Sequence, residues 1–298
     1  MSSGITPDIN QLLALRHSAK ELQLFNPARV NSLNTGINLS HARGRGMDFD
    51  EVRRYQAGDD IRLIHWQLSA RLGKTYTKVY HEERERALYL IIDQSISMRF
   101  ATKVAFKSVI AANLAAILGW SALSAHQQVG GVIFNDANSS YVKPKRSRQS
   151  LLDRFNLLSS EKLTRPQGGL INSLQFILTQ IHSGSSVVVL SDFSQISPEV
   201  ERYLRLIAQK SELTNLLIYD PIEANLPISG SFNFTNQTQQ QLEISANSRS
   251  CERYALPFAQ AEQHLRQFSR QNGMQFIKLA TNDDLVGTLK RGIKTHGK

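Results

Sequence analysis

The sequence predicts an α/β protein of the doubly wound class, in which helices cover both faces of a mostly parallel sheet. From Ala87 onward, short apolar runs typical of buried strands alternate with longer segments of helical periodicity. The connections between these segments are short, as they are in α/β domains. A length of 298 residues and an apolar fraction of 41% allow the chain to bury a substantial core.

The strands and helices expected after residue 87 follow one another in a regular order. The expected strands are Leu88 to Asp93, Val129 to Asn135, Ser186 to Asp192, Asn215 to Tyr219 and Met274 to Leu279. The expected helices are Val104 to Ala125, Ser150 to Leu158, Leu170 to Ile181, Pro198 to Ser211, Tyr254 to Gln271 and Asp283 to Ile293.

Two segments interrupt this order. Tyr141 to Arg148 has Pro144 among basic residues, and we expect an exposed loop there. The runs Ser231 to Thr235 and Gln241 to Ser245 are β-like and are joined by a polar turn, which predicts a hairpin inserted at the rim of the sheet.

The first 86 residues have a different character. An amphipathic pattern begins at Pro7 and ends before Pro27, which predicts a helix. Basic and acidic residues are closely mixed between Arg43 and Arg86, and Lys74 to Tyr80 alternates like a strand. We therefore expect two parts, an N-terminal helix with a small charged, partly β unit in residues 1–86 and the α/β domain in residues 87–298.

Composition excludes some classes of protein. Cys251 is the single cysteine, so no internal disulfide can form, and the cytoplasm is the expected location. Charged residues interrupt Pro7 to Phe25, unlike a signal peptide. Ser108 to Asn135 is uncharged and long enough to cross a bilayer, but polar residues divide it into a core helix and a strand, so no membrane span is expected.

Asp93, Ser95 and Ser97 directly follow the apolar strand that ends at Ile92. In an open α/β sheet, the ligand crevice lies beyond the carboxyl ends of the strands. A carboxylate and two hydroxyls are ligands suited to Mg²⁺, and Asp192, at the end of another strand, could hold a bound water. The alternative is a strand-to-helix turn capped by short polar side chains, which needs no metal.

The stretch from Gly44 to Met98 resembles the signature region of the bacterial family known as domain of unknown function 58. A second segment, from Asp220 to Gly230, resembles the family's second marker. The matching positions of the first segment are Gly46, Phe49, Glu51, Val52, Arg53, Tyr55, Gly58, Asp59, Asp60, Ile64, Trp66, Ala70, Arg71, Gly73, Glu82, Glu83, Arg84 and Glu85, and those of the second are Asp220, Pro221, Glu223, Leu226, Pro227 and Gly230.

This resemblance implies a von Willebrand factor A-like fold. It also implies that Asp93, Ser95 and Ser97 form the first element of a metal-ion-dependent adhesion site and that Asp192 is its last element. Members of the family are commonly encoded beside MoxR-type AAA+ ATPases and are thought to act with them in the assembly or maturation of other proteins. The implied partners are therefore such an ATPase and a client protein.

One departure from the family pattern bears on the metal. The middle element of the adhesion site is usually a Thr after paired glycines, but Leu170 follows Gly168 and Gly169 here. Thr164 lies too early to replace it without a different loop path. We therefore expect weak Mg²⁺ binding at best, with a partner carboxylate completing the site.

The charged segment from Asp48 to Trp66 has two interpretations. One is a network of ion pairs that attaches the small unit to the main domain, and this interpretation is favoured. The other is a docking surface in which Arg53, Arg54 and Arg62 bind acidic groups of a partner. Trp66 is expected to anchor a core rather than to bind.

Three functions follow from these patterns. The leading hypothesis, which the family resemblance implies, is a non-catalytic adaptor or chaperone-like scaffold that binds an AAA+ ATPase or a client at the adhesion-site edge. No nucleophile, phosphate loop or histidine cluster in the sequence indicates catalysis. The second is a metal-dependent phosphoesterase that uses Asp93 and Asp192. The third is nucleic-acid binding, since the net charge is +10 and basic residues gather at Lys143, Lys145, Arg146 and Arg148.

Overall fold

The computed structural model describes residues 4–22, 47–56, 59–82, 87–160, 163, 168–194, 196–226, 231–235, 241–245 and 248–294. The chain forms two compact units, one of Met1–Val30 with Arg86–Lys298 and one of Asn31–Glu85. This division differs from the expected boundary at residue 86, because the N-terminal helical segment belongs to the larger unit.

The larger unit is built on a six-stranded sheet with the order β10-β7-β6-β3-β4-β5. All neighbouring strands are parallel except β4 and β5, which form an antiparallel pair at one edge. The strands are β3 (Ala87–Asp93), β4 (Gln128–Phe134), β5 (Ser139–Lys145), β6 (Ser186–Ser191), β7 (Glu212–Tyr219) and β10 (Gln275–Ala280). The predicted doubly wound α/β fold, with a mostly parallel sheet, is confirmed.

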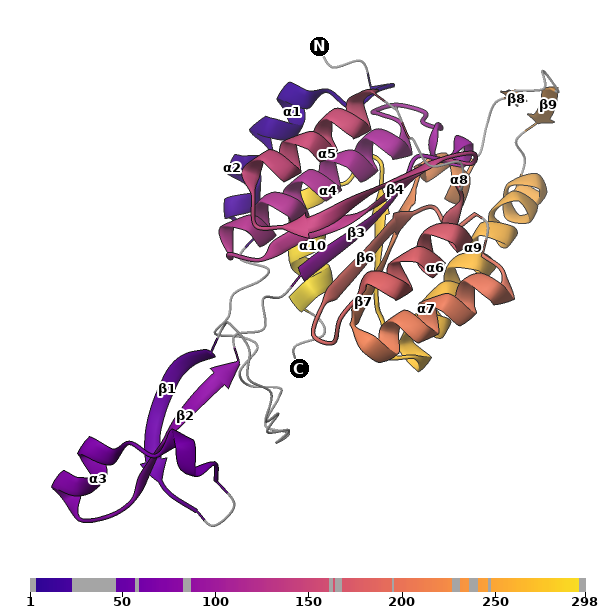
Figure 1. The fold of residues 1–298 in the computed structure, drawn as a ribbon. Coiled ribbons are helices and arrows are strands. Elements are labelled where there is room, and N and C mark those ends of the chain that lie inside the picture. The colour runs from indigo at the N-terminus through magenta and orange to yellow at the C-terminus, as the bar shows by residue number, and fades with distance from the viewer. Residues whose placement is uncertain are drawn as a thin grey trace. The chain divides into compact units, whose positions relative to one another are not determined.

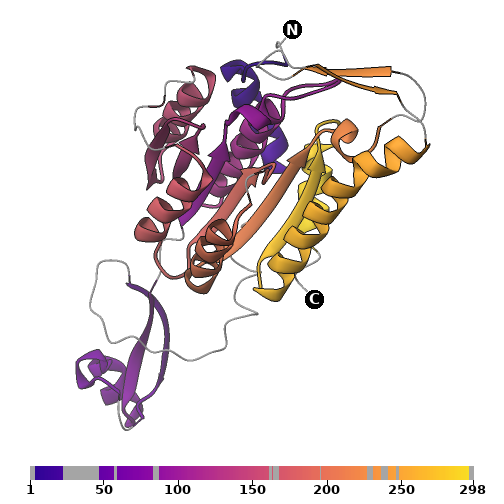
Figure 2. The same cartoon turned by 90° about the vertical axis from the view of Figure 1, so that its right-hand side faces the viewer.

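Helices cover both faces of this sheet (Figures 1 and 2). On one face lie α1 (Ile9–Ala14), α2 (Arg16–Lys20), α4 (Lys107–Ser124), α5 (Arg148–Ser160) and α10 (Leu285–Lys294). On the other lie α6 (Leu170–Gln180), α7 (Pro198–Lys210) and α9 (Ser248–Gln271). The short helix α8 (Pro221–Ala224) and the 3₁₀ turn η3 (Ile96–Met98) follow strands β7 and β3.

Strand β3 shows why the sheet is buried on both faces. Leu88, Leu90 and Ile92 pack into the cluster under α4, whereas Tyr89 and Ile91 pack into the cluster under α6 and α7. Successive side chains of a strand point to opposite faces, so a strand covered on both sides is a continuous apolar run. This run fixes β3 in the centre of the sheet and carries its last residue to the carboxyl edge.

Helix α4 is apolar on all sides because it is enclosed on all sides. Among the described residues, α4 is the one helix that is both long enough and apolar enough to cross a membrane. It is 89% buried within the unit. It contacts β3 and β4 below and α1, α2 and α5 above. These contacts agree with the core helix expected from the sequence.

The expected loop from Tyr141 to Arg148 is wrong, because most of it is the edge strand β5. Pro144 is accommodated there since an edge strand leaves one row of N–H groups unpaired. Lys143 and Lys145 are exposed on this edge, where charged side chains discourage pairing with another sheet. Arg146 Nη2 lies 2.7 Å from His126 Nδ1.

The N-terminal segment is two short helices instead of the single one expected. Leu12 is fully buried, and Leu12 O accepts a hydrogen bond of 3.0 Å from the indole Nε1 of Trp120 on α4. Ala19 and Leu22 join the same core. The segment is therefore part of the helical layer over the sheet.

The smaller unit is a two-stranded antiparallel sheet with short helical turns. Strand β1 (Met47–Arg54) pairs with β2 (Tyr76–Glu82), and η2 (Ile61–Leu63) and α3 (Trp66–Leu72) lie between them in sequence. The strand predicted around Lys74 to Tyr80 is confirmed, and its partner β1 was not anticipated. The hairpin β8 (Ser231–Thr235) with β9 (Gln241–Ser245) has the predicted bounds and antiparallel pairing.

Leu12→Ala tests whether the N-terminal helices stabilise the larger unit. We expect a loss of about 2–5 kcal/mol in the free energy of unfolding, the cost of truncating a fully buried leucine. Urea unfolding followed by circular dichroism measures it. The control is Ile5→Ala, since Ile5 is 59% exposed. Equal stability of the two variants would show that the segment is not part of the core.

Candidate functional site

The candidate site lies where β3 and β6 end side by side. These strands are parallel neighbours, with Ile92 paired to Leu190. Asp93 is the last residue of β3, and Asp192 directly follows β6. The two carboxylates are close enough for the charge of Asp192 to contribute to raising the pKa of Asp93. The expectation that both emerge at one edge of a shared sheet is therefore confirmed.

Asp93 is held by the chain around it. Its Oδ1 accepts a hydrogen bond of 2.8 Å from Ser95 N, and its Oδ2 accepts one of 2.5 Å from Ser191 Oγ. The residue is only 4% exposed. Burial raises the pKa of Asp93 from 3.8 to about 6, although the hydrogen bonds from Ser191 and Ser95 oppose this. The carboxylate is thus fixed in place at an energetic cost, as is common at functional sites.

Three hydroxyls connect the loops that follow the two strands. Ser95 Oγ lies 3.2 Å from Ser97 Oγ, and Ser194 Oγ donates to Ser97 Oγ at 3.1 Å. Ser194 N donates to Asp192 Oδ1 at 3.0 Å. The predicted residues Asp93, Ser95, Ser97 and Asp192 therefore belong to one polar cluster, which Ser191 and Ser194 complete.

Asp192 is also paired with an internal cation. Lys107, the first residue of α4, is 1% exposed, and its Nζ donates to Asp192 Oδ2 at 2.8 Å and to Glu223 Oε1 at 2.7 Å. Burial alone would lower the pKa of Lys107, but the two carboxylates raise it above its ordinary value. Burial alone would raise the pKa of Asp192, but Lys107 lowers it. Lys107 and Asp192 are therefore held as ions.

Glu223 is positioned by the cap of the short helix α8. Its Oε2 accepts a hydrogen bond of 2.8 Å from Asp220 N, in a capping box that leaves Oε1 for Lys107. Asp220 is fully buried and accepts hydrogen bonds from Thr102 and Thr281 as well as from Ile222 N. The loop after β7 is thereby tied to the loop after β3.

Sequence reasoning missed several residues of this cluster. Lys107 was placed within a helix regarded as core, and its signal was a lone cation at the start of a long uncharged segment. Glu223 was noted in the second marker but was given no role. Asp136 in the loop after β4 accepts a hydrogen bond of 2.7 Å from Ile96 N, and no pattern in the sequence indicated it.

The described residues at the end of the third loop, Gly168 and Gly169, contribute backbone and no side-chain oxygen. Gly169 has φ +83° and precedes α6, and a Cβ on Gly168 would lie 2.3 Å from Asn135 O. Both positions therefore require glycine. Leu170 follows with 4% exposure and packs in the core under α6. Thr164 lies outside the described residues.

These residues fit a divalent metal poorly. Each oxygen of Asp93 already accepts a hydrogen bond, and Asp192 faces the ammonium of Lys107. Leu170 supplies no side-chain oxygen. The hollow bounded by Asp93, Ser95 and Asp136 measures about 10 Å³, close to the ~10–15 Å³ that one water molecule needs. A hexacoordinate Mg²⁺ with its waters needs more oxygens and more room.

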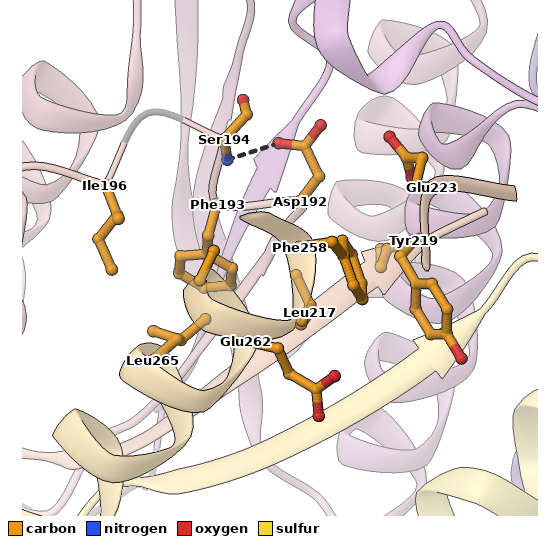
Figure 3. A pocket seen from close by; sticks show the side chains of 12 residues that line it. Asp192, Phe193, Ser194, Ile196, Leu217, Tyr219, Glu223, Phe258, Glu262 and Leu265 are labelled. Atoms are coloured by element: carbon orange, nitrogen blue, oxygen red, sulfur yellow. Dashed lines mark hydrogen bonds between the residues drawn. The ribbon is translucent and has the colours of Figure 1, made fainter. Parts of the chain in front are cut away.

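An apolar recess opens beside the polar cluster (Figure 3). It measures about 200 Å³ and lies between the carboxyl ends of β6 and β7 and one face of α9. Asp192 and Glu223 bound it on one side and Glu262 on the other, with the rings of Phe258 and Tyr219 between them, their centroids 5.2 Å apart. It is smaller than the ~300–1,000 Å³ of most small-molecule sites, so its size suits a side chain.

The three arginines predicted to bind a partner lie in the smaller unit. Arg53 is paired with Asp59 at 2.7 Å, while Arg54 and Arg62 are exposed and make no ion pair with a described side chain. The expectation that Trp66 anchors a core is wrong within the described residues, since Trp66 is 65% exposed. Ile61 and Leu72 of the same unit are 62% and 51% exposed.

Comparison with known families identifies the family to which the chain belongs. Residues 51–267 match the family model described as "Protein of unknown function DUF58". The chain belongs to this family. The match covers most of the charged segment, the edge residues Asp93, Lys107, Asp192 and Glu223, and most of α9. The DUF58 resemblance seen in the sequence is therefore confirmed.

Curated relatives of this DUF58 protein are uncharacterised. "Uncharacterized protein Rv1480" of Mycobacterium tuberculosis (strain ATCC 25618 / H37Rv) is 26% identical over 223 residues, which are 72% of this chain and 68% of that protein. "Uncharacterized protein Mb1516" of Mycobacterium bovis (strain ATCC BAA-935 / AF2122/97) matches to the same extent. Neither name describes an activity.

Solved structures show more distant similarity. The conserved hypothetical protein BatB from Bacteroides thetaiotaomicron has a TM-score of 0.44 and 11% identity, over 70% of this chain and 98% of that one. An aerotolerance-related membrane protein from Bacteroides fragilis NCTC 9343 has a TM-score of 0.44 and 13% identity, over 70% and 99%. A von Willebrand factor type A protein from Catenulispora acidiphila has a TM-score of 0.38 and 12% identity, over 74% and 43%. Similarity at this level says nothing about what the DUF58 chain binds.

Asp93→Asn tests whether the buried charge of Asp93 lowers the stability of the folded state at neutral pH. Because burial raises the pKa of Asp93 to about 6, the folded state binds a proton more tightly than the unfolded state, and the Asp93 contribution to stability falls as pH rises from about 4 through 6. The amide of an asparagine does not titrate in this range, so the variant does not lose stability in this way. We expect the variant to gain on the order of 3 kcal/mol over wild type between pH 4 and pH 7, at about 1.4 kcal/mol per pKa unit.

Urea unfolding at pH 4, 5, 6 and 7 in EDTA measures this difference. Ser97→Ala is the control, since it alters the cluster without removing a titrating group. A difference between Asp93→Asn and wild type that does not change with pH would show that Asp93 titrates like an exposed carboxyl group.

Proposed function

We propose that this DUF58 chain is a non-catalytic adaptor that binds another protein at the carboxyl edge of its sheet. We further propose that it acts with a MoxR-type AAA+ ATPase in the assembly or maturation of other proteins, from a cytoplasmic location. Membership of the family supports the choice of partner, and the geometry of the edge supports binding as the role. Function is argued from the site because one fold serves many functions.

The observation that carries the proposal is the apolar recess next to the polar cluster. A small apolar hollow with a few fixed polar groups at its rim is suited to receive one anchoring side chain of a partner. Ile96 is 45% exposed on the loop after β3, and Val104 is 57% exposed beyond it. Apolar side chains at an otherwise polar edge provide further contact area.

The contacts of the carboxylates favour binding over catalysis. A general base must be free to accept a proton from a substrate, but Asp192 is paired with Lys107 and Asp93 accepts two internal hydrogen bonds. The same contacts weigh against the phosphoesterase alternative, in which both carboxylates would ligate metal ions. The weak Mg²⁺ site that the resemblance implies is the competing prediction, which a metal titration decides.

The smaller unit offers a second surface for a partner. Arg54 and Arg62 are exposed and can form bidentate contacts with carboxylates. The exposed side chains of Ile61, Trp66 and Leu72 belong to the same unit, and aromatic residues and arginines are enriched in protein interfaces. We propose that this unit contributes to docking, with Arg53 held in position by Asp59.

Ala261→Trp tests the recess as the contact. Ala261 is exposed on α9 and lines the recess, so a large ring there fills the hollow with little effect on the core. We expect capture of the AAA+ ATPase from the native host to fall by at least about tenfold, which corresponds to about 1.4 kcal/mol. Gln260→Trp is the matched control, because Gln260 is exposed on the same helix and does not line the recess.

The measurement is affinity capture with the tagged full chain, in nucleotide-loaded lysate, with quantification of the ATPase by mass spectrometry. Equal capture by both tryptophan variants would place the contact elsewhere. Recovery of no AAA+ ATPase by the wild-type chain would contradict the proposed partner.

A further inference from the structure

A lysine side chain supplies a buried cation at the carboxyl edge of the sheet. Lys107 is buried, and its Nζ contacts carboxylates from two different strand ends, Asp192 after β6 and Glu223 after β7. These residues lie 85 and 116 positions away from it in the sequence. The ammonium therefore joins three loops of the edge, as a bridging metal ion would.

The position of Lys107 is unfavourable for a cation unless carboxylates are close to it. It is the first residue of an 18-residue helix, where the helix dipole favours negative charge and a cation is destabilising. Burial adds the cost of removing an ammonium from water. The ion pairs with Asp192 and Glu223 offset both costs. The ring of Phe100 is 5.9 Å from Nζ and shields the group.

The same contacts occupy carboxylate oxygens that a metal would use. Asp192 Oδ2 accepts from Lys107, and Asp192 Oδ1 accepts from Ser194 N. A hard divalent cation needs several free oxygens and is repelled by an ammonium within a low-dielectric site. Leu170 further reduces the number of available oxygens. The metal that the fold implies and the lysine that the chain contains are therefore alternatives.

We propose that the Lys107 ammonium replaces the divalent metal at this edge, so that the chain binds its partner through a site closed by its own cation and independent of Mg²⁺. The contacts of Lys107 with Asp192 and Glu223 and the loss of an oxygen donor at Leu170 carry this proposal. It concerns the same edge as the proposed function, but metal binding is measured on the purified chain without any partner.

The first experiment titrates wild-type protein with Mn²⁺, a spectroscopic substitute for Mg²⁺, and follows free Mn²⁺ by electron paramagnetic resonance. We expect the wild-type chain to show no Mn²⁺ binding that depends on Asp192, so that Asp192→Asn gives the same titration curve. Thermal unfolding midpoints with millimolar Mg²⁺ and with EDTA are expected to coincide, because a ligand of the native state would raise the midpoint. Saturable Mn²⁺ binding that is lost in Asp192→Asn would overturn the proposal.

The second experiment uses the double variant Lys107→Met with Glu223→Gln. It removes the ammonium and one of its two carboxylates, so that one buried charge remains on Asp192, and the Gln oxygen can still accept from Asp220 N. We expect Mn²⁺ affinity at least about tenfold above that of wild type, because a carboxylate oxygen becomes free for a hard cation.

The matched control adds Asp192→Asn to the double variant, and the gain in Mn²⁺ binding is expected to disappear. A folded double variant with no gain over wild type would show that Lys107 does not exclude the metal. If the double variant does not fold, the wild-type titration decides the question by itself.

Capture of the partner by the wild-type chain in EDTA distinguishes this inference from the proposed function. Equal capture in EDTA and in Mg²⁺ supports both. The ATPase itself needs Mg²⁺ to hold its nucleotide. Capture that requires Mg²⁺ therefore overturns the metal-independent site when the purified chain also binds Mn²⁺ in the titration, and it leaves the adaptor role standing. Failure to capture an AAA+ ATPase in either buffer contradicts the adaptor role, while the Mn²⁺ titration still tests the role of Lys107.

Discussion

The ammonium of Lys107 is the charge around which the edge of the sheet is organised. It is buried at the start of α4 and pairs with Asp192 and Glu223, so it links the loops that follow β3, β6 and β7. Removing one partner of a buried ion pair leaves a charge without compensation, which makes such a group difficult to lose. The positions of Asp192 and Glu223 therefore depend on a residue that lies in neither of their segments.

Asp93 presents the opposite situation. It has no cationic partner among the described contacts, and it is held by Ser95 N and Ser191 Oγ in a buried position that raises its pKa to about 6. The edge thus combines Asp192, whose charge is neutralised by Lys107, with Asp93, whose pKa is raised by burial. Such pairs of unlike carboxylates mark sites where structure has been arranged for a purpose other than stability.

The two units differ in how they use apolar residues. The larger unit encloses its longest apolar helix completely, and its apolar recess is confined to the space between β6, β7 and α9. The smaller unit leaves Ile61, Trp66 and Leu72 exposed, and Arg54 and Arg62 of the same unit are exposed as well. Large exposed apolar side chains in one small unit are typical of an interaction surface. The proposed adaptor role would use both regions, which differ in their chemistry.

The sequence by itself determined the class of fold and the place of the site. Alternating apolar runs and helical segments gave the sheet and its helices, and Asp93 and Asp192 were assigned to one edge because parallel strands end together. Local pattern failed where context decides: Pro144 suggested a loop, yet an edge strand tolerates it, and Trp66 suggested a core, yet it is exposed. Only the tertiary structure decided which cation neutralises Asp192. Lys107 and Glu223 are distant from it in sequence and have no characteristic spacing, and the strand order alone brings them within hydrogen-bonding distance.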